Sequence, residues 1–280
     1  MTPRRDLGEL LLEEVLADVL QDGQVELAPL VSAAQHAEVD AGVFADEEIH
    51  LMRGQIDDRP DEFIDAPRLG QLSEHDQDVA LETALWLLQA QGAATWDDSR
   101  EAFEFVGPYA IVGELRHEPE AAVSVRVDVR GEGTRRAAIY RVRPDLFLTE
   151  DVSEVGLHHF VFRSAPSAAT WLAGLVDPLS RAKGSAHEQR ARTAADLNPN
   201  LDQLTARCES SALVFYGARS PDGSSAQRAF TCYSGNDGVY VLWGWQSASS
   251  GEAVLYRLGP GDLIGFCLGF LARLEGDGAP

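Results

Sequence analysis

Three glycines near the C-terminal end of the sequence lie where a phosphate-binding loop could form. Gly259, Gly261 and Gly265 follow a predicted strand and open a predicted helix, as the glycine-rich loop of dinucleotide-binding folds does. Only 15 residues follow Gly265, too few for the helix and second parallel strand of such a fold. Asp262 would also place a carboxylate against the pyrophosphate. A helix that starts at Pro260 explains the pattern better, and we predict no cofactor.

Histidines and carboxylates gather in two places where a metal site could form. His158 and His159 are adjacent on a predicted strand, so their side chains point to opposite faces and cannot share one metal ion. The segment Asp46–His50 holds three carboxylates, but only Asp46 and His50 are spaced to share a helix face. A solvated acidic helix face explains this segment more simply than a metal site does, so we predict no metal.

The sequence shows no nucleophile in a recognisable catalytic motif. It contains no Gly-x-Ser-x-Gly, no His-Glu-x-x-His and no pair of cysteines at two-residue spacing. The three cysteines, Cys208, Cys232 and Cys267, are odd in number and widely spaced, which is typical of buried thiols in a reducing compartment. We therefore predict no catalytic residues, a protein that is not an enzyme, and a cytoplasmic location.

The charge of the chain is strongly acidic and uneven, which restricts its partners. The formal net charge is −22, and the first hundred residues hold 23 acidic and 6 basic side chains. Such a surface repels phosphate groups, so nucleic acid and anionic membranes are excluded as expected partners. The sequence has no apolar run of about 18 residues, and its start turns acidic at Glu9, Glu13 and Glu14. We expect neither a membrane span nor a signal peptide.

Helical periodicity dominates the first hundred residues, and alternation dominates the rest. We predict helices at Leu7–Leu20, Leu27–Ala37, Asp46–Gln55 and Val79–Gln91, with Ser73 able to cap the entry to the last of these. From about residue 108, period-two patterns separated by turn residues predict strands. They lie at Ala121–Arg130, Arg135–Val142, Leu146–Glu150 and Leu157–Ser164, then at Ser211–Arg219, Gln227–Ser234, Val239–Gln246 and Ala253–Leu258. Each series is followed by a helix, at Ser167–Val176 and Pro260–Leu274.

The two strand series match at an offset of 90–95 residues, which predicts an internal duplication. The expected fold class is α+β. Its central antiparallel sheet would consist of two pseudo-symmetric four-strand-plus-helix units flanked by helices, with an N-terminal helical region. The expected parts are an acidic helical region at 1–100, a first unit at 101–179, a polar linker at 180–200 and a second unit at 201–280.

The predicted strand Val239–Gln246 is apolar on both faces, which is unusual for an antiparallel sheet with one face in water. Either both faces are covered, for which the N-terminal helices are the favoured candidates, or one face docks a partner. We expect Trp243 to be buried and Trp245, near the strand end, to contact a partner. The other tryptophans, Trp86, Trp96 and Trp171, lie in helical or near-helical contexts and are expected in the core.

This layout resembles the EspG family of type VII secretion chaperones. The resembling residues are the helix Leu81–Gln91, the segment Leu115–Pro119 before Val123–Val127, and the strand–helix junctions His158–Val176 and Val254–Leu271. The resemblance covers roughly residues 79–274. It implies a central antiparallel sheet with pseudo-two-fold symmetry flanked by helical bundles. It also implies a cytosolic protein that binds the tips of secreted PE–PPE heterodimers and keeps them ready for secretion.

We therefore expect a non-enzymatic chaperone or adaptor that holds a protein client, such as a secreted helical heterodimer. The alternative is an immunity protein that neutralises a secreted toxin. A basic partner of either kind would be attracted by acidic side chains at Asp57, Asp58, Asp61, Glu62 and Asp65. With Trp245, these residues are the candidate partner contacts.

Overall fold

The computed structural model of this chain describes residues 9–11, 20–21, 24–25, 27–53, 68–99, 102–117, 119, 121–184, 187–191, 202–219, 225–244 and 253–275. The chain forms two compact units, each assembled from two separate stretches of sequence. Unit 1 comprises residues 1–119 and 139–164, and unit 2 comprises residues 120–138 and 165–280. This division differs from the linear one expected from the sequence, and residues 180–200 lie inside unit 2.

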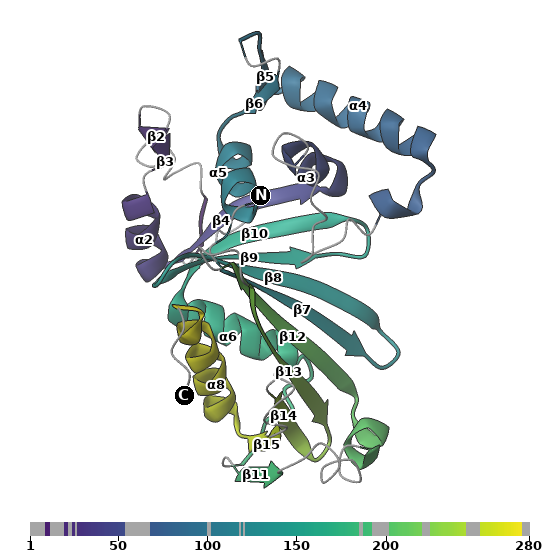
Figure 1. The fold of residues 1–280 in the computed structure, drawn as a ribbon, viewed down its shortest axis with the longest axis vertical. Coiled ribbons are helices and arrows are strands. Elements are labelled where there is room, and N and C mark those ends of the chain that lie inside the picture. Colours follow the sequence, from purple (N-terminus) through teal and green to yellow (C-terminus); the bar gives the residue numbers. More distant parts are fainter. Residues whose placement is uncertain are drawn as a thin grey trace, which may run out of the picture. The chain divides into compact units, whose positions relative to one another are not determined.

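The fold is α+β and is dominated by antiparallel strand pairing, as predicted. In unit 1 the strands lie in the order β1-β4-β10-β9, and Figure 1 shows β4, β10 and β9 side by side. Their bounds are β1 (Glu9–Leu11), β4 (Glu38–Ala45), β9 (Leu146–Val152) and β10 (Leu157–Ser164). Two short hairpins join β2 (Leu20–Gln21) to β3 (Gln24–Val25) and β5 (Ala94–Asp97) to β6 (Ala102–Phe105). Among the strands that the structure describes, β1 alone pairs in parallel, with β4.

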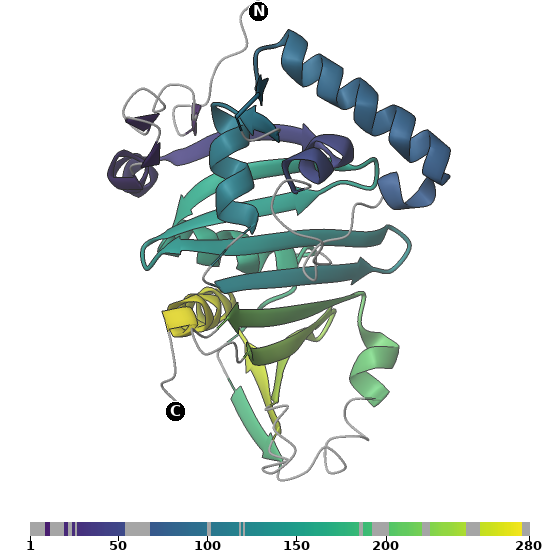
Figure 2. The same cartoon turned by 45° about the horizontal axis from the view of Figure 1, so that its top comes forward.

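The helices of unit 1 pack against this strand group and against one another. They are α2 (Leu27–His36), α3 (Asp46–Arg53), η1 (Leu69–Gln71), α4 (Glu74–Ala90) and α5 (Pro108–His117). The ring of Phe44 on β4 meets those of Tyr109 on α5 and Phe160 on β10 edge-on, with centroids 4.9 and 5.4 Å apart. In Figures 1 and 2, α4 runs along the outer side of α3, away from β4, β9 and β10.

In unit 2 the strands follow the order β7-β12-β13-β14-β15-β11, and each pairs antiparallel with the next. The bounds are β7 (Ala121–Val129), β11 (His187–Ala191), β12 (Ser210–Arg219), β13 (Ser225–Gly235), β14 (Gly238–Gly244) and β15 (Ala253–Leu258). Its helical elements include α6 (Ala165–Val176), α8 (Pro260–Ala272) and η2 (Arg273–Glu275), and α6 and α8 lie side by side (Figure 1). Strand β8 (Gly133–Arg143) begins in unit 2 and ends in unit 1.

Helix α8 begins where the glycine pattern indicated. Pro260 occupies the first turn, where its missing amide hydrogen costs nothing, and Gly259 precedes it as the N-cap. A Cβ atom on Gly259 would lie 2.1 Å from the carbonyl oxygen of Gly184, so the close approach of two backbones requires glycine there. Gly259 is therefore explained by the packing of two backbone segments.

The predicted strands after residue 120 and the helices α2, α3, α4, α6 and α8 are confirmed. The prediction of a helix over Leu7–Leu20 is wrong, because Glu9–Leu11 pairs with Glu38–Asp40 as a strand. Strand β4 was not predicted, and β11, which pairs with β15, lies in the predicted linker. In each case hydrogen bonding to a neighbouring strand outweighs local propensity. The internal duplication stays a prediction.

Candidate protein-docking site

The candidate partner contacts chosen from the sequence lie outside the described residues. These are Trp245, Asp57, Asp58, Asp61, Glu62 and Asp65. Trp243 is described and is half-buried, which is less than the full burial we expected. Its ring lies within 6.3 Å of Phe230 and within 5.9 Å of Phe266 and Phe270 of α8, measured between centroids. Trp243 therefore belongs to the packing between β14 and α8.

Two of the tryptophans expected in the core are on the surface instead. The Trp86 side chain on α4 is 68% exposed and Trp96 on β5 is 49% exposed, while Trp171 is partly buried. Two aliphatic residues of α4 accompany them, Leu87 at 56% and Val79 at 50% exposure. We name Val79, Trp86, Leu87 and Trp96 the α4–hairpin surface. Exposed tryptophans are rare, and they are the residues most often found as anchors of protein interfaces.

The helical geometry of α4 explains how one helix can be both packed and exposed. Leu88 is fully buried, and Leu81 lies close to the same side of the helix. Val79 and Trp86, seven residues apart, share the opposite side and face solvent. Helix α4 contacts α3, yet Val79 and Trp86 stay exposed on the side of the helix opposite Leu88.

The hairpin that carries Trp96 is fastened directly to the end of α4. The amide of Ala93 donates a hydrogen bond to the carbonyl of Leu88 (2.8 Å), and the amide of Val106 donates one to the carbonyl of Ala93 (3.0 Å). Across the hairpin, Phe103 supports the ring of Trp96 edge-on at 4.9 Å. These contacts hold the Trp96 ring in place, which lowers the entropy lost when a partner orders it.

The α4–hairpin surface is framed by acidic side chains. Between Leu69 and Ser99 the chain has six acidic residues and no lysine or arginine. Asp78 and Glu82 are exposed and lie one turn apart on α4, beside Trp86. Asp98 and Glu104 are exposed on and beside the hairpin. The site therefore combines an apolar centre with a negative rim.

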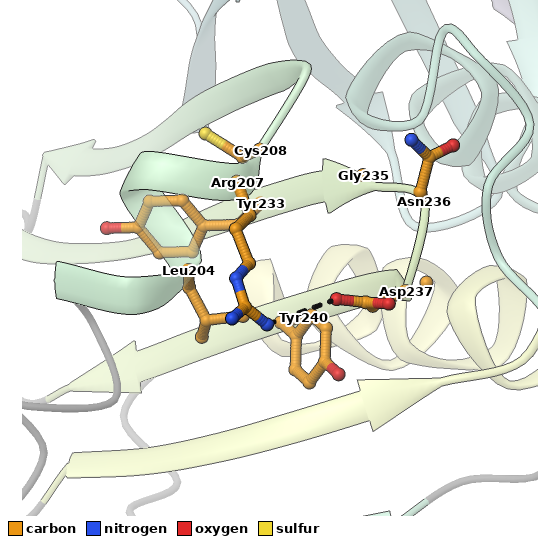
Figure 3. Close-up of a pocket in the computed structure, with 9 residues that line it drawn as sticks. Leu204, Arg207, Cys208, Tyr233, Gly235, Asn236, Asp237 and Tyr240 are labelled. Atoms are coloured by element: carbon orange, nitrogen blue, oxygen red, sulfur yellow. Dashed lines mark ion pairs between the residues drawn. The ribbon is translucent and has the colours of Figure 1, made fainter.

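Unit 2 contains a shallow cavity of about 250 Å3. It is lined by Leu204, Arg207, Cys208, Tyr233, Gly235, Asn236, Asp237, Gly238 and Tyr240 (Figure 3). The guanidinium of Arg207 is paired with Asp237 at 3.9 Å, and the guanidinium of Arg257 lies over the Tyr240 ring at 5.9 Å. The lining combines two tyrosine rings with polar and charged side chains.

A buried charge cluster lies in the interior of unit 1. His158 Nε2 is 2.6 Å from Asp46 Oδ1, and His158 Nδ1 is 2.5 Å from Glu150 Oε1. Arg116 Nε contacts Glu150 at 3.2 Å, and the Tyr140 hydroxyl donates a hydrogen bond to the same carboxylate. All five side chains are buried or nearly so. Two carboxylates and two cations balance each other, so the cluster is neutral when His158 is protonated.

The pKa values in this cluster follow from the hydrogen bonds. Burial alone would lower the pKa of His158, but its bonds to Asp46 and Glu150 raise that pKa above the ordinary value. Burial would raise the pKa of Glu150, but Arg116 and His158 hold it at about 2. Burial opposes a low pKa for Asp46 as well, yet His158 and the amides of Leu69 and Arg68 lower it. His158 is therefore the protonated centre of the cluster.

The structure corrects our view of the segment Asp46–His50 as a solvated acidic face. Asp46 is fully buried at the start of α3, and its second carboxylate oxygen accepts the amides of Arg68 (2.6 Å) and Leu69 (3.0 Å). His159 points to the other face of β10, as predicted, and is exposed beside Asp40. Within the described ranges, no group of three histidine, cysteine or acidic side chains could hold a metal ion. Because the charge cluster is closed to solvent, we interpret it as a structural element of unit 1.

Compared with known protein families and with curated proteins, the chain matches none of them. Within the part of the chain that the structure describes, no helix has the length and apolar character needed to cross a bilayer. The geometry of the site therefore carries the functional argument.

Proposed function

We propose that this chain is a non-enzymatic, cytoplasmic chaperone or adaptor that holds a protein client at the α4–hairpin surface. The exposure of Trp86 carries the proposal. A tryptophan that leaves two thirds of its side chain in water forgoes a large hydrophobic gain, which a partner can recover. Val79, Leu87 and Trp96 are exposed apolar residues of the same helix and of the hairpin that follows it. The resemblance to EspG-type secretion chaperones supports a secreted client.

The site has the composition of a protein interface. It includes two exposed tryptophans, with exposed acidic side chains nearby in the sequence, and tryptophan anchors often supply much of the binding energy of an interface. An anionic lipid surface does not suit the site, because six carboxylates and no basic side chain lie between Leu69 and Ser99. A protein client is therefore the partner that fits these residues best.

The experiment is to measure the solubility of secreted proteins encoded beside this chain, co-expressed with and without it. We expect one of them to become soluble and to purify with the chain in a fixed ratio. The double substitution Trp86→Ala/Leu87→Ala should abolish both effects, while Val43→Ala should not, since Val43 is also 56% exposed but lies on β4. The proposal would be contradicted if the client were equally soluble without the chain. It would also be contradicted if Val43→Ala reduced client solubility and co-purification as much as Trp86→Ala/Leu87→Ala does. Neutralisation of a co-encoded toxin would favour the immunity alternative.

A further inference from the structure

We infer that the segment of the client that occupies the α4–hairpin surface is a basic amphipathic α-helix. The inference rests on the proposed function and adds the chemistry of the partner. It is drawn from the spacing of the exposed apolar residues on α4 and from the charges around them.

The spacing on α4 matches a helical partner. Val79, Trp86 and Ala90 lie on one side of the helix, and Leu87 widens that side near its C-terminal end. The stripe from Val79 to Ala90 spans about 16 Å, which is about three helical turns. A second helix packed along it would need apolar side chains at intervals of three and four residues over the same length.

The charges beside the stripe select a basic partner. Asp78 and Glu82 flank Trp86 on one side, and Asp76 lies on the other side near the start of α4. Lysine or arginine side chains on the rim of the docked helix would face these carboxylates. An acidic client helix would meet like charge, and so would a second copy of this chain docked through the same surface.

The test uses two labelled synthetic helical peptides of 18 residues with the same leucine stripe, one flanked by lysines and the other by glutamates. Binding to the full-length chain is measured by fluorescence anisotropy at 0.1 M salt. We expect the lysine peptide to bind at least tenfold more tightly than the glutamate peptide. Trp86→Ala and Asp78→Asn/Glu82→Gln should each weaken binding of the lysine peptide about threefold or more.

The matched control is Glu132→Gln/Asp145→Asn, which removes the same number of negative charges from two exposed turns. We expect this control to leave the affinity within twofold of the original. The inference would be overturned if the two peptides bound equally tightly, or if Trp86→Ala left the affinity unchanged. It would also be overturned if Asp78→Asn/Glu82→Gln and Glu132→Gln/Asp145→Asn weakened binding of the lysine peptide equally. If the peptides fail while client solubility still requires Trp86, the inference alone is wrong. If the lysine peptide binds as expected but no client depends on the chain, the proposed function alone is wrong.

Discussion

His158 Nε2 lies 2.6 Å from Oδ1 of Asp46, a residue 112 positions earlier in the chain, and both side chains are buried. This contact joins the start of α3 to β10 inside unit 1. Removing the imidazole would leave Asp46 and Glu150 buried next to each other without the cation between them. We predict that His158→Gln lowers the free energy of unfolding by about 3–5 kcal/mol, the usual range for breaking a buried ion pair.

The adjacent histidine is the control for this measurement. His159 is exposed, and its contact with Asp40 is 3.1 Å long at the surface. His159→Gln should change the free energy of unfolding by less than about 1 kcal/mol in chemical denaturation. Similar losses from the two substitutions would show that the buried cluster contributes no more than a surface contact.

Stability should depend on pH through the same cluster. The pKa of Glu150 is lowered to about 2, so its contribution is present above its ordinary pKa and is lost as the pH falls toward 2. The pKa of His158 is raised, so its contribution is complete below about pH 6.5 and is lost as the pH rises through the higher value. We expect the difference in unfolding free energy between the original chain and His158→Gln to be largest near pH 5–6. A difference that is the same from pH 3 to pH 9 would contradict this assignment.

Gly156 tests how tightly the cluster is enclosed. Its φ is +76°, and a Cβ atom there would lie 2.8 Å from Oδ2 of Asp46. Gly131 also has a positive φ, of +85°, but a Cβ atom there would have no neighbour within 4 Å. Both Gly→Ala substitutions should cost about 1–2 kcal/mol for the backbone conformation. Gly156→Ala should cost more in urea denaturation, because it also displaces the Asp46 carboxylate. Equal costs would mean that Asp46 can move without loss.

Alanine substitutions at the two tryptophans should have different effects: we expect Trp243→Ala to lower stability, and Trp86→Ala to weaken partner binding without lowering stability. Trp243→Ala removes ring contacts with Phe230, Phe266 and Phe270, and we expect a loss of about 2–3 kcal/mol, below the 3–5 kcal/mol of a fully buried tryptophan. Trp86→Ala should change the free energy of unfolding by less than about 0.5 kcal/mol, because the Trp86 side chain is largely in water. A large stability loss from Trp86→Ala would assign that residue to the core of unit 1.

Much of the fold could be predicted because apolar and polar residues alternate clearly along most of its strands. Strands β7 to β10 and β12 to β15 carry period-two patterns separated by glycine-rich or proline-containing turns, which local sequence can specify. Strand β11, with the sequence HEQRA, carries no such pattern, and its assignment depends on pairing with β15. Strand β4 was missed because Gly42 interrupts it, at the irregularity in its pairing with Phe160 and Val161.

The candidate site was harder to predict for two physical reasons. Helix α4 is apolar on two sides, with Leu88 on one and Val79 and Trp86 on the other, so the sequence alone does not show which side is covered. The charge cluster joins residues as distant as Asp46 and His158, and only the tertiary structure brings them together.

The most direct test of the docking site is site-specific photo-crosslinking in cells of the source organism. A photoreactive amino acid would replace Trp86 in the full-length chain, and in a matched chain it would replace Val43, which is exposed to 56% on β4. We predict that position 86 crosslinks one protein in high yield and that position 43 does not. The crosslinked peptide should come from a helix with basic residues beside its apolar stripe. Absence of a crosslink at position 86, or the same crosslinked proteins at both positions, would contradict the account.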